Sequence, residues 1–125
     1  MREFRVTLSH KAGELARLGQ LLASRGLDLR SVAGMAHGNK AEICLVAKDV
    51  TAMRSALSEA GMQFEESEIV SELMEDSPGA VAHLCNRLAE FNVNINSLYI
   101  LARDNPLVEM GMTVDDPKKA KKALE

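Results

Sequence analysis

The stretch HKAGELARLGQLLASRGLDLRSV, residues 10–32, decides the fold because the chain repeats it as DSPGAVAHLCNRLAEFNVNINSL, residues 76–98. Aligned without a gap, the two stretches place Gly13 opposite Gly79, and every aligned pair is separated by 66 positions. A repeat this long corresponds to a whole small domain rather than to one unit of a solenoid. The sequence therefore predicts a duplicated module, with its function where copies of the module meet.

The repeat continues toward the C-terminus with one residue gained. Glu42 is repeated as Glu109, at a separation of 67 positions. We therefore predict two modules, residues 1–66 and 67–125. Modules of roughly 60 residues are near the lower size limit for an independent hydrophobic core. We expect the modules to pack together and the chain to form at least a homodimer.

The composition excludes several classes of function. A net charge of −3 argues against nucleic-acid binding, because neutralising phosphates needs a basic surface. No apolar run approaches the ~18 residues of a membrane helix, and the charged, alternating start of the chain is not a secretory signal. Cys44 and Cys85 fall at unmatched positions of the repeat, which predicts neither a disulfide framework nor a metal site. We expect a cytoplasmic protein without a cofactor.

Hydrophobic spacing predicts the elements of the first module. Phe4, Val6 and Leu8 alternate with polar residues, as in a half-buried strand. Leucines then recur at helical spacing as far as a terminating Gly26. In order, the predicted elements are a strand over 4–9, a helix over 12–24, strands over 27–37 and 41–46, a helix capped by Asp49 or Thr51, and a strand over 62–66.

The second copy predicts the same order without the last strand. Its predicted elements are a strand over 68–74, a helix capped by Ser77 with Pro78 in its first turn, strands over 93–102 and 107–114, and a final helix from Pro117. A βαββαβ order with right-handed crossovers gives an antiparallel sheet with both helices on one face. The predicted fold class is α+β, with two ferredoxin-like βαββαβ modules, of which the second lacks its fourth strand.

The turns from strand to helix resemble the ACT domain family. The family pattern is Asp/Asn-x-Pro-Gly before a helix that begins Gly-x-Leu-x-x-Leu, followed by Gly-Val-Asn-Ile on the next strand. The second copy reads DSPGAV at 76–81 and NVNIN at 92–96, and the first reads HKAGEL at 10–15 and GLDL at 26–29. The resemblance covers nearly the whole chain and is to small tandem ACT proteins without a catalytic domain. It implies a regulatory protein, not an enzyme, that binds an amino acid between two copies.

The groups of a free amino acid fit these positions chemically. Amide donors at a helix N-terminus suit a carboxylate, and the two glycines of the turns let a ligand approach the backbone. Asp28 and Asn94, each 15 residues after its glycine, offer a side-chain oxygen that can accept from an ammonium. The candidate ligand-binding residues are His10, Lys11, Ala12, Gly13, Glu14, Leu15 and Asp28 in the first copy, and Asp76, Ser77, Pro78, Gly79, Ala80, Val81, Asn94 and Ile95 in the second.

The two half-sites are expected to be unequal. Ala12 stands where the family has proline. Glu14 would repel a ligand carboxylate, and Lys11 could offset that repulsion. We therefore favour the loop over 76–81 for the carboxylate.

Three classes of function compete: an amino-acid sensor, a structural dimerisation module with no ligand, and an enzyme. The glycines of the turns are equally well explained by the backbone, and Ser77 and Pro78 by helix capping. On this architecture an acylphosphatase needs an arginine in its glycine-rich loop and a copper chaperone needs Cys-x-x-Cys, and the chain has neither. Three phenylalanines and one tyrosine make a poor RNA-recognition surface. The sensor is favoured, with the dimerisation module as the alternative.

Overall fold

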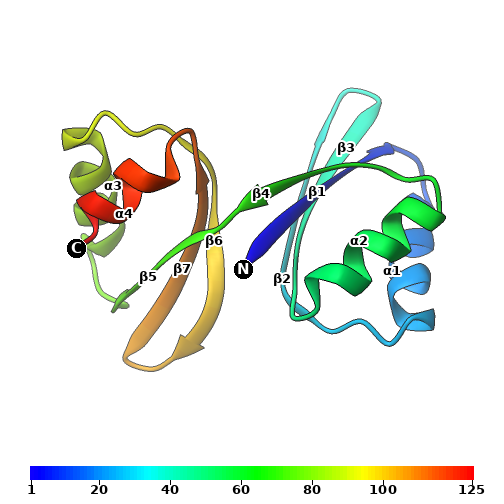
Figure 1. The fold of residues 1–125 in the computed structure, drawn as a ribbon, viewed down its shortest axis with the longest axis horizontal. Coiled ribbons are helices and arrows are strands. Elements are labelled where there is room, and N and C mark those ends of the chain that lie inside the picture. Colours follow the sequence, from blue (N-terminus) through cyan, green and yellow to red (C-terminus); the bar gives the residue numbers. More distant parts are fainter. The chain divides into compact units, whose positions relative to one another are not determined.

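The computed structural model describes residues 1–125, and its contacts divide the chain into two compact units, Met1–Ser67 and Glu68–Glu125. Figure 1 shows each unit as a sheet with two helices packed on one face. The two units have the same order of elements as far as their second helix.

The first unit has the full βαββαβ order. Its elements are β1 (Arg2–Ser9), α1 (Glu14–Ser24), β2 (Leu29–His37), β3 (Lys40–Ala47), α2 (Val50–Glu59) and β4 (Gln63–Glu68). The strands form one sheet in the order β2-β3-β1-β4, and β3 pairs antiparallel with both β1 and β2. This arrangement confirms the predicted ferredoxin-like module.

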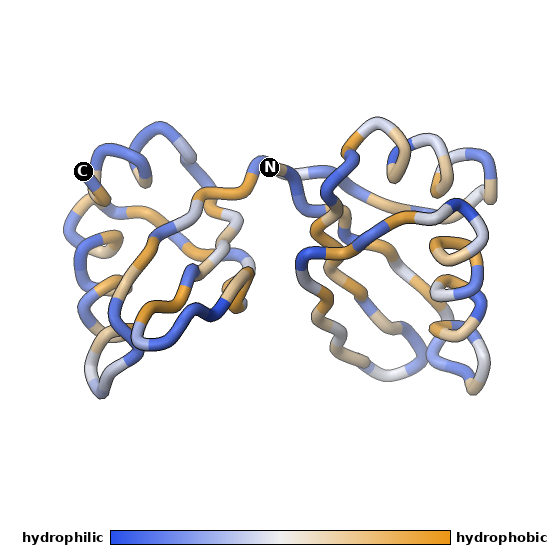
Figure 2. Tube along the Cα trace, turned by 90° about the horizontal axis from the view of Figure 1, so that it is seen from below, coloured by the Kyte–Doolittle hydropathy of each residue, from blue (hydrophilic) through white to orange (hydrophobic).

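The core of the first unit lies between the sheet and its helices. Phe4, Val6 and Leu8 alternate along β1 and are buried, because alternate side chains of a strand point to one face. Leu18 and Leu22 of α1 are buried in the same cluster. Figure 2 shows hydrophobic and hydrophilic positions alternating along the strands and helices. The half-buried strand and the leucine stripe predicted from the sequence are both confirmed.

The second unit has the same order but three strands. Its elements are β5 (Val70–Glu75), α3 (Ala80–Glu90), β6 (Ile95–Asp104), β7 (Leu107–Val114) and α4 (Pro117–Ala123). The strands are ordered β5-β7-β6, and β7 pairs antiparallel with both neighbours. β5 is therefore an edge strand, whereas β1, at the equivalent place in the first unit, is an interior strand. The prediction that the second module lacks its fourth strand is confirmed.

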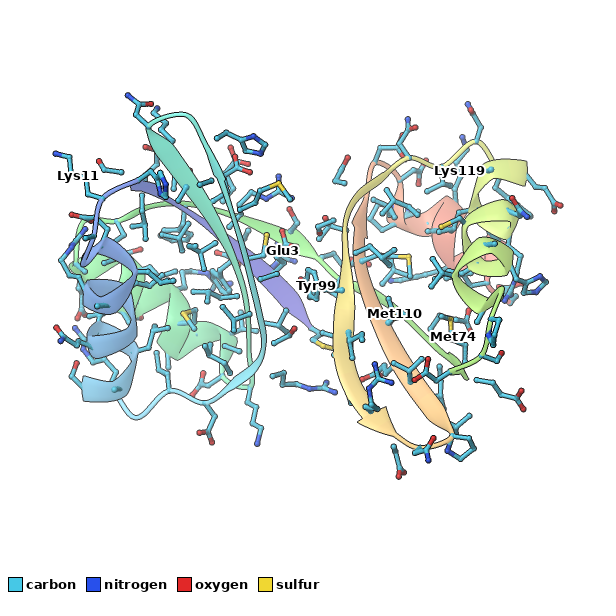
Figure 3. All side chains as sticks on the ribbon, turned by 180° about the vertical axis from the view of Figure 1, so that it is seen from behind. Glu3, Lys11, Met74, Tyr99, Met110 and Lys119 are labelled. Atoms are coloured by element: carbon cyan, nitrogen blue, oxygen red, sulfur yellow. The ribbon has the colours of Figure 1, made fainter.

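The core of the second unit is rich in methionine and aliphatic residues. Met110 and Met112 alternate on β7 and are buried against Leu84 and Leu88 of α3. Figure 3 shows Met110 and Met74 pointing to the helix side of the sheet. The unbranched thioether side chain adapts to irregular gaps between elements. The two methionines of β7 therefore belong to the hydrophobic core.

The second helix of each unit begins at an aspartate cap. The carboxylate Oδ1 of Asp49 accepts a hydrogen bond of 3.0 Å from the amide of Ala52, and Oδ1 of Asp116 accepts one of 3.2 Å from the amide of Lys119. Each cap satisfies one of the amides that a helix leaves without an intrahelical partner. The cap predicted at Asp49 or Thr51 is at Asp49.

We expect Asp49→Ala to lower the free energy of unfolding by about 1 kcal/mol. Asp49→Asn is the matched control, because asparagine is an equally good cap and also removes the charge. Urea unfolding of both variants measures the effect. Equal losses in the two variants would show that charge rather than capping matters at this position.

The first helix of each unit begins without a side-chain cap, unlike the second. The predicted start of α1 at Ala12 and the predicted Ser77 cap of α3 are both wrong. α1 starts at Glu14 rather than Ala12, and α3 starts at Ala80 with no side-chain cap. Ser77 takes part through its backbone carbonyl, which accepts from the amide of Ala80 at 3.2 Å. The residues at the N-cap positions are Gly13 and Gly79, in the left-handed region with φ of 90° and 87°. Such a backbone reverses direction before the helix, so the serine hydroxyl is not placed as a cap.

Candidate functional site

The loop between β5 and α3 is a tight turn with free amide donors. In this loop the Ser77 amide donates to the carbonyl of Glu75 at 3.0 Å and the Ala80 amide donates to the carbonyl of Ser77 at 3.2 Å. The His83 amide donates to the carbonyl of Gly79 at 2.9 Å. The amides of Gly79 and Val81 donate to no backbone carbonyl in this turn. Donors at the start of a helix point out of it and favour an anion. The loop can therefore receive a carboxylate.

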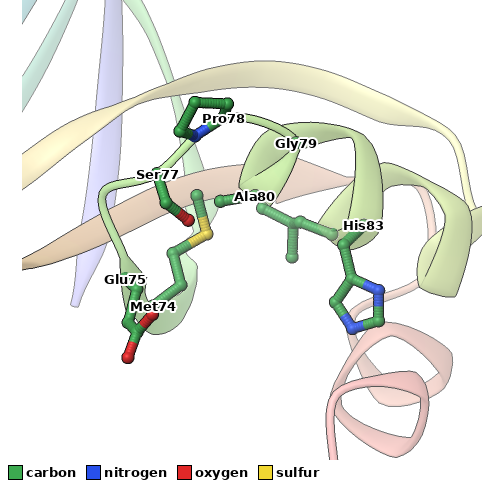
Figure 4. Close-up of a pocket in the computed structure, with 8 residues that line it drawn as sticks. Met74, Glu75, Ser77, Pro78, Gly79, Ala80 and His83 are labelled. Atoms are coloured by element: carbon green, nitrogen blue, oxygen red, sulfur yellow. The ribbon is translucent and has the colours of Figure 1, made fainter.

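A cavity of about 320 Å³ opens beside this turn. Figure 4 shows the Met74 side chain reaching from β5 toward Ser77 and Ala80, with His83 one turn further along α3. Its lining consists of Met74, Glu75, Ser77, Pro78, Gly79, Ala80, His83 and Leu84. Four of the predicted loop residues line the cavity, and Asp76 and Val81 do not.

Asp76 and Val81 have other environments. The Asp76 carboxylate accepts a hydrogen bond from the guanidinium of Arg103 on β6 and forms an ion pair with it. Val81 is 47% exposed on α3. Arg103 thus neutralises the acidic residue nearest the turn, which lowers the repulsion that a ligand carboxylate would meet there.

The equivalent loop of the first unit borders a larger cavity, of about 520 Å³. All six predicted loop residues line it, together with residues of β1, β2 and β3. The complete lining is Leu8, Ser9, His10, Lys11, Ala12, Gly13, Glu14, Leu15, Gly34, Met35, Ala36, Ala41 and Ile43. The lining thus combines apolar residues of β2 and β3 with polar residues of the loop.

Gly34 is one of the β2 residues that line the first cavity. A methyl group placed on Gly34 would come within 2.8 Å of the Cδ1 atom of Ile43. The second unit has Ile100 opposite Met110, in the same register as Gly34 opposite Ile43. The Ile43 side chain therefore occupies the space that a side chain at position 34 would need. Sequence reasoning missed these sheet residues, although the repeat alignment combined with the strand order could have identified them.

The charges of the first loop are arranged differently from the prediction. Glu14 forms an ion pair of 3.0 Å with Arg17, one turn along α1, so Arg17 rather than Lys11 offsets its charge. Lys11 projects away from the loop (Figure 3). His10 donates its backbone amide to the carbonyl of Asn39 at 2.8 Å, which ties the loop to the β2–β3 turn.

Asp28 and Asn94 lie at the other end of their units. Each follows the C-terminal end of the first helix and precedes the next strand. α1 and α3 have 11 residues each, which at 1.5 Å per residue is about 16 Å of helix. Within either unit, the structure therefore does not bring the loop together with Asp28 or Asn94. Ile95, the next residue, is partly buried against the core of the second unit.

Asn94 is held by Asp115, a residue that sequence reasoning missed. The Asp115 carboxylate accepts a hydrogen bond of 3.0 Å from the Asn94 backbone amide and one of 3.1 Å from Asn94 Nδ2. The backbone amide, with the carboxamide adding to its effect, holds the pKa of Asp115 below its usual value. Two residues 21 positions apart carry no local signal of this contact.

The structure contains no cluster of three or more His, Cys, Asp or Glu side chains that could hold a metal ion. None of its helices has the length and apolar character needed to cross a membrane.

Comparison with solved structures identifies the fold. The chain is similar to protein BT0572 from Bacteroides thetaiotaomicron, with a TM-score of 0.88 and 19% identity over 98% of this chain and 85% of that one. It is also similar to the regulatory subunit of aspartate kinase from Thermus thermophilus, with a TM-score of 0.69 and 17% identity over 98% and 87%. This is a tandem ACT-like fold. The regulatory subunit from Thermus flavus gives a TM-score of 0.64 and 18% identity over 98% and 88%.

The tandem ACT-like fold confirms the resemblance inferred from the glycine turns. No family model matches the sequence, and no curated protein matches it at a significant level. The tandem ACT-like chain resembles regulatory subunits over nearly its whole length.

We expect Gly79→Ala to lower the free energy of unfolding by about 1–2 kcal/mol, because a residue with a Cβ atom is strained in the left-handed region. A methyl group at Gly79 would meet no atom within 4 Å, so the cost would come from the backbone alone. Gly19→Ala is the matched control. Gly19 lies inside α1 with equally free space, and alanine there should stabilise by about 0.5–1 kcal/mol. Urea unfolding that showed the same sign for both variants would contradict this account of the turn.

Proposed function

We propose that this protein is a regulatory protein that binds a free amino acid through the glycine turns of its ACT-like modules. The observation that carries the proposal is the turn at Gly79, where free amide donors stand at the mouth of a cavity. The similarity to regulatory subunits of aspartate kinase supports it.

The carboxylate of the amino acid would bind at the turn. The amides of Gly79 and Val81 offer donors at the positive end of the α3 dipole, and hydrogen bonds to a charged group contribute about 1.5–3 kcal/mol each. The ligand side chain would enter the adjoining cavity. A cavity of about 320 Å³ in the second unit and one of about 520 Å³ in the first would favour side chains of different size.

The ammonium group would bind at Asp28 or Asn94. Because each of these residues lies a helix length away from the loop of its own unit, a ligand that contacts both must use the loop of one module and the strand start of another. We therefore propose that the complete site needs two modules. The regulated partner would be an enzyme, by analogy with the aspartate kinase subunits.

Thermal stability in the presence of each of the twenty amino acids tests the proposal. A ligand that binds only the folded state stabilises it by RT ln(1 + [L]/Kd), which is about 2.7 kcal/mol at 100 times Kd. We expect one amino acid, or a few related ones, to raise the melting temperature at millimolar concentration. If none of the twenty does so, the protein is a dimerisation module rather than a sensor.

We also propose a homo-oligomer, and expect sedimentation to show at least a dimer of the 13.6 kDa chain at micromolar concentration. β5 has a hydrogen-bonded neighbour on one side only, and proteins usually protect an open sheet edge. Exposed apolar residues on β2, including Val32 and Met35, add surface that association would cover. A monomer throughout the micromolar range would contradict this proposal.

A further inference from the structure

Asn94 and Asp115 form a hydrogen-bonded pair in which the Asp115 carboxylate accepts and Asn94 donates. Asp115 lies directly after β7 and Asn94 directly before β6. One oxygen of the Asp115 carboxylate accepts from the Asn94 backbone amide and the other accepts from Asn94 Nδ2, at 3.0 and 3.1 Å. In return, the Asp115 amide donates to the Asn94 backbone carbonyl at 3.1 Å. Three hydrogen bonds thus fix one residue against the other.

The pair decides which atom Asn94 presents to a ligand. A carboxamide has a donor side and an acceptor side, and by itself it can turn either outward. A carboxylate only accepts, so Asp115 requires the Nδ2 side of Asn94 to face it. The Oδ1 atom of Asn94, an acceptor, is then turned away from Asp115 on an exposed residue.

We propose that Asp115 is a positioning residue, which fixes Asn94 Oδ1 as the acceptor for the ammonium group of a bound amino acid. The inference rests on the proposed function, since it concerns the recognition of the same ligand. It adds a specificity: the fixed oxygen favours a ligand with an α-ammonium group over one that offers only acceptors.

The first unit also presents a side-chain oxygen acceptor at this position, but without a partner that orients it. Lys48 stands at the position equivalent to Asp115, and its amide donates to the Asp28 carbonyl at 3.4 Å. A lysine side chain cannot accept a hydrogen bond, so it could not orient an asparagine as Asp115 does. Asp28 needs no orientation, because both of its side-chain oxygens are acceptors. Each unit thus presents an oxygen acceptor at this place, and only the second needs a partner for it.

Protonation of Asp115 would undo the arrangement. The hydrogen bonds from Asn94 hold the pKa of Asp115 below its usual value, so the carboxylate is charged throughout the neutral range. The contribution of the pair is therefore present above the ordinary aspartate pKa and is lost as the pH falls through the lowered one. In this acidic range, the Asn94 carboxamide is free to turn.

The test compares Asp115→Asn with the wild type by calorimetry, using the amino acid that gives the largest thermal stabilisation among the twenty. Asparagine at 115 offers a donor as well as an acceptor, so it allows Asn94 to turn its Nδ2 outward. We expect affinity to fall about ten-fold, which corresponds to about 1.4 kcal/mol. Asp116→Asn is the matched control, because it makes the same charge change next door and keeps a good helix cap.

Two further measurements separate positioning from a structural role. In the Asn94→Ala background, Asp115→Asn should change affinity no further, since the group it positions is absent. For the deaminated analogue of the same amino acid, Asp115→Asn should leave affinity unchanged. A general loss of structure would instead weaken binding in both cases.

A readout without ligand checks the contact itself. The side-chain amide resonances of Asn94 should shift in the wild type as Asp115 titrates at acidic pH, and should not shift in Asp115→Asn. Wild-type affinity in Asp115→Asn would overturn the positioning role while leaving the proposed function intact. If the wild type binds none of the twenty amino acids, the proposed function fails and this inference falls with it.

Discussion

Truncation of Leu88 to alanine is expected to lower the free energy of unfolding by about 2–5 kcal/mol. Leu88 is fully buried on α3 and belongs to the core cluster that includes Met112 and Val93. Alanine would remove three carbon atoms and leave a cavity, because the surrounding side chains relax only partly. Urea unfolding followed by circular dichroism measures the loss.

The control for this prediction is Leu73→Ala. Leu73 lies on β5 in the same unit but is 60% exposed, so its truncation should change the free energy of unfolding by no more than about 0.5 kcal/mol. The same chemical change at the two sites isolates the contribution of burial. An unfolding midpoint of Leu88→Ala equal to that of the wild type would contradict the packing of α3 on its sheet.

Removal of the Asn94 side chain is expected to weaken amino-acid binding about ten-fold or more, since a hydrogen bond to a charged group contributes about 1.5–3 kcal/mol. Asn94 is exposed and carries the acceptor that Asp115 orients. Asp28→Ala tests the equivalent position of the first unit. Calorimetric titration of the wild type and both variants with the same amino acid measures the change.

The affinities of Asn94→Ala and Asp28→Ala show which unit binds the ammonium group. A loss in Asn94→Ala alone would assign the ammonium to the second unit, and a loss in Asp28→Ala alone would assign it to the first. Circular dichroism spectra and melting temperatures show whether each variant remains folded. If the wild type binds and neither folded variant binds less tightly, the ammonium is recognised elsewhere in the molecule.

Much of the fold could be predicted from the sequence because its signals are local and occur twice. The alternation of Phe4, Val6 and Leu8 and the helical spacing of Leu18 and Leu22 each identify a face of one element. Those faces meet in one buried cluster. Because the sequence repeats, the same elements could be predicted for the second unit. That unit has the more complete motif, at Gly79, but lacks the last strand.

The start of α3 was harder to predict because two local rules compete there. Ser77 and Pro78 have the composition of a helix cap and a first turn. Gly79 instead takes up a left-handed conformation with φ of 87° and becomes the N-cap residue itself. The helix begins two residues later than a serine cap implies. A glycine at this point permits the sharp turn that leaves the amides free.

The remaining features of the candidate site depend on pairing between distant residues. Gly34 leaves room for the Ile43 side chain because β2 places it opposite Ile43. Asp115 orients Asn94 because β7 ends where β6 begins. Hydrophobic spacing within one element reveals neither contact, since both require the strand order and the register.

The central claim is that a free amino acid binds at the glycine turns, and a two-dimensional amide NMR titration of the wild type tests it most directly. The titrant is the amino acid that most raises the melting temperature. We predict saturable shifts of the backbone amides of Gly79 and Val81, or of Gly13 in the equivalent turn, together with the side-chain amide of Asn94. Saturable shifts confined to other parts of the chain, or no shifts at millimolar concentration, would contradict the account.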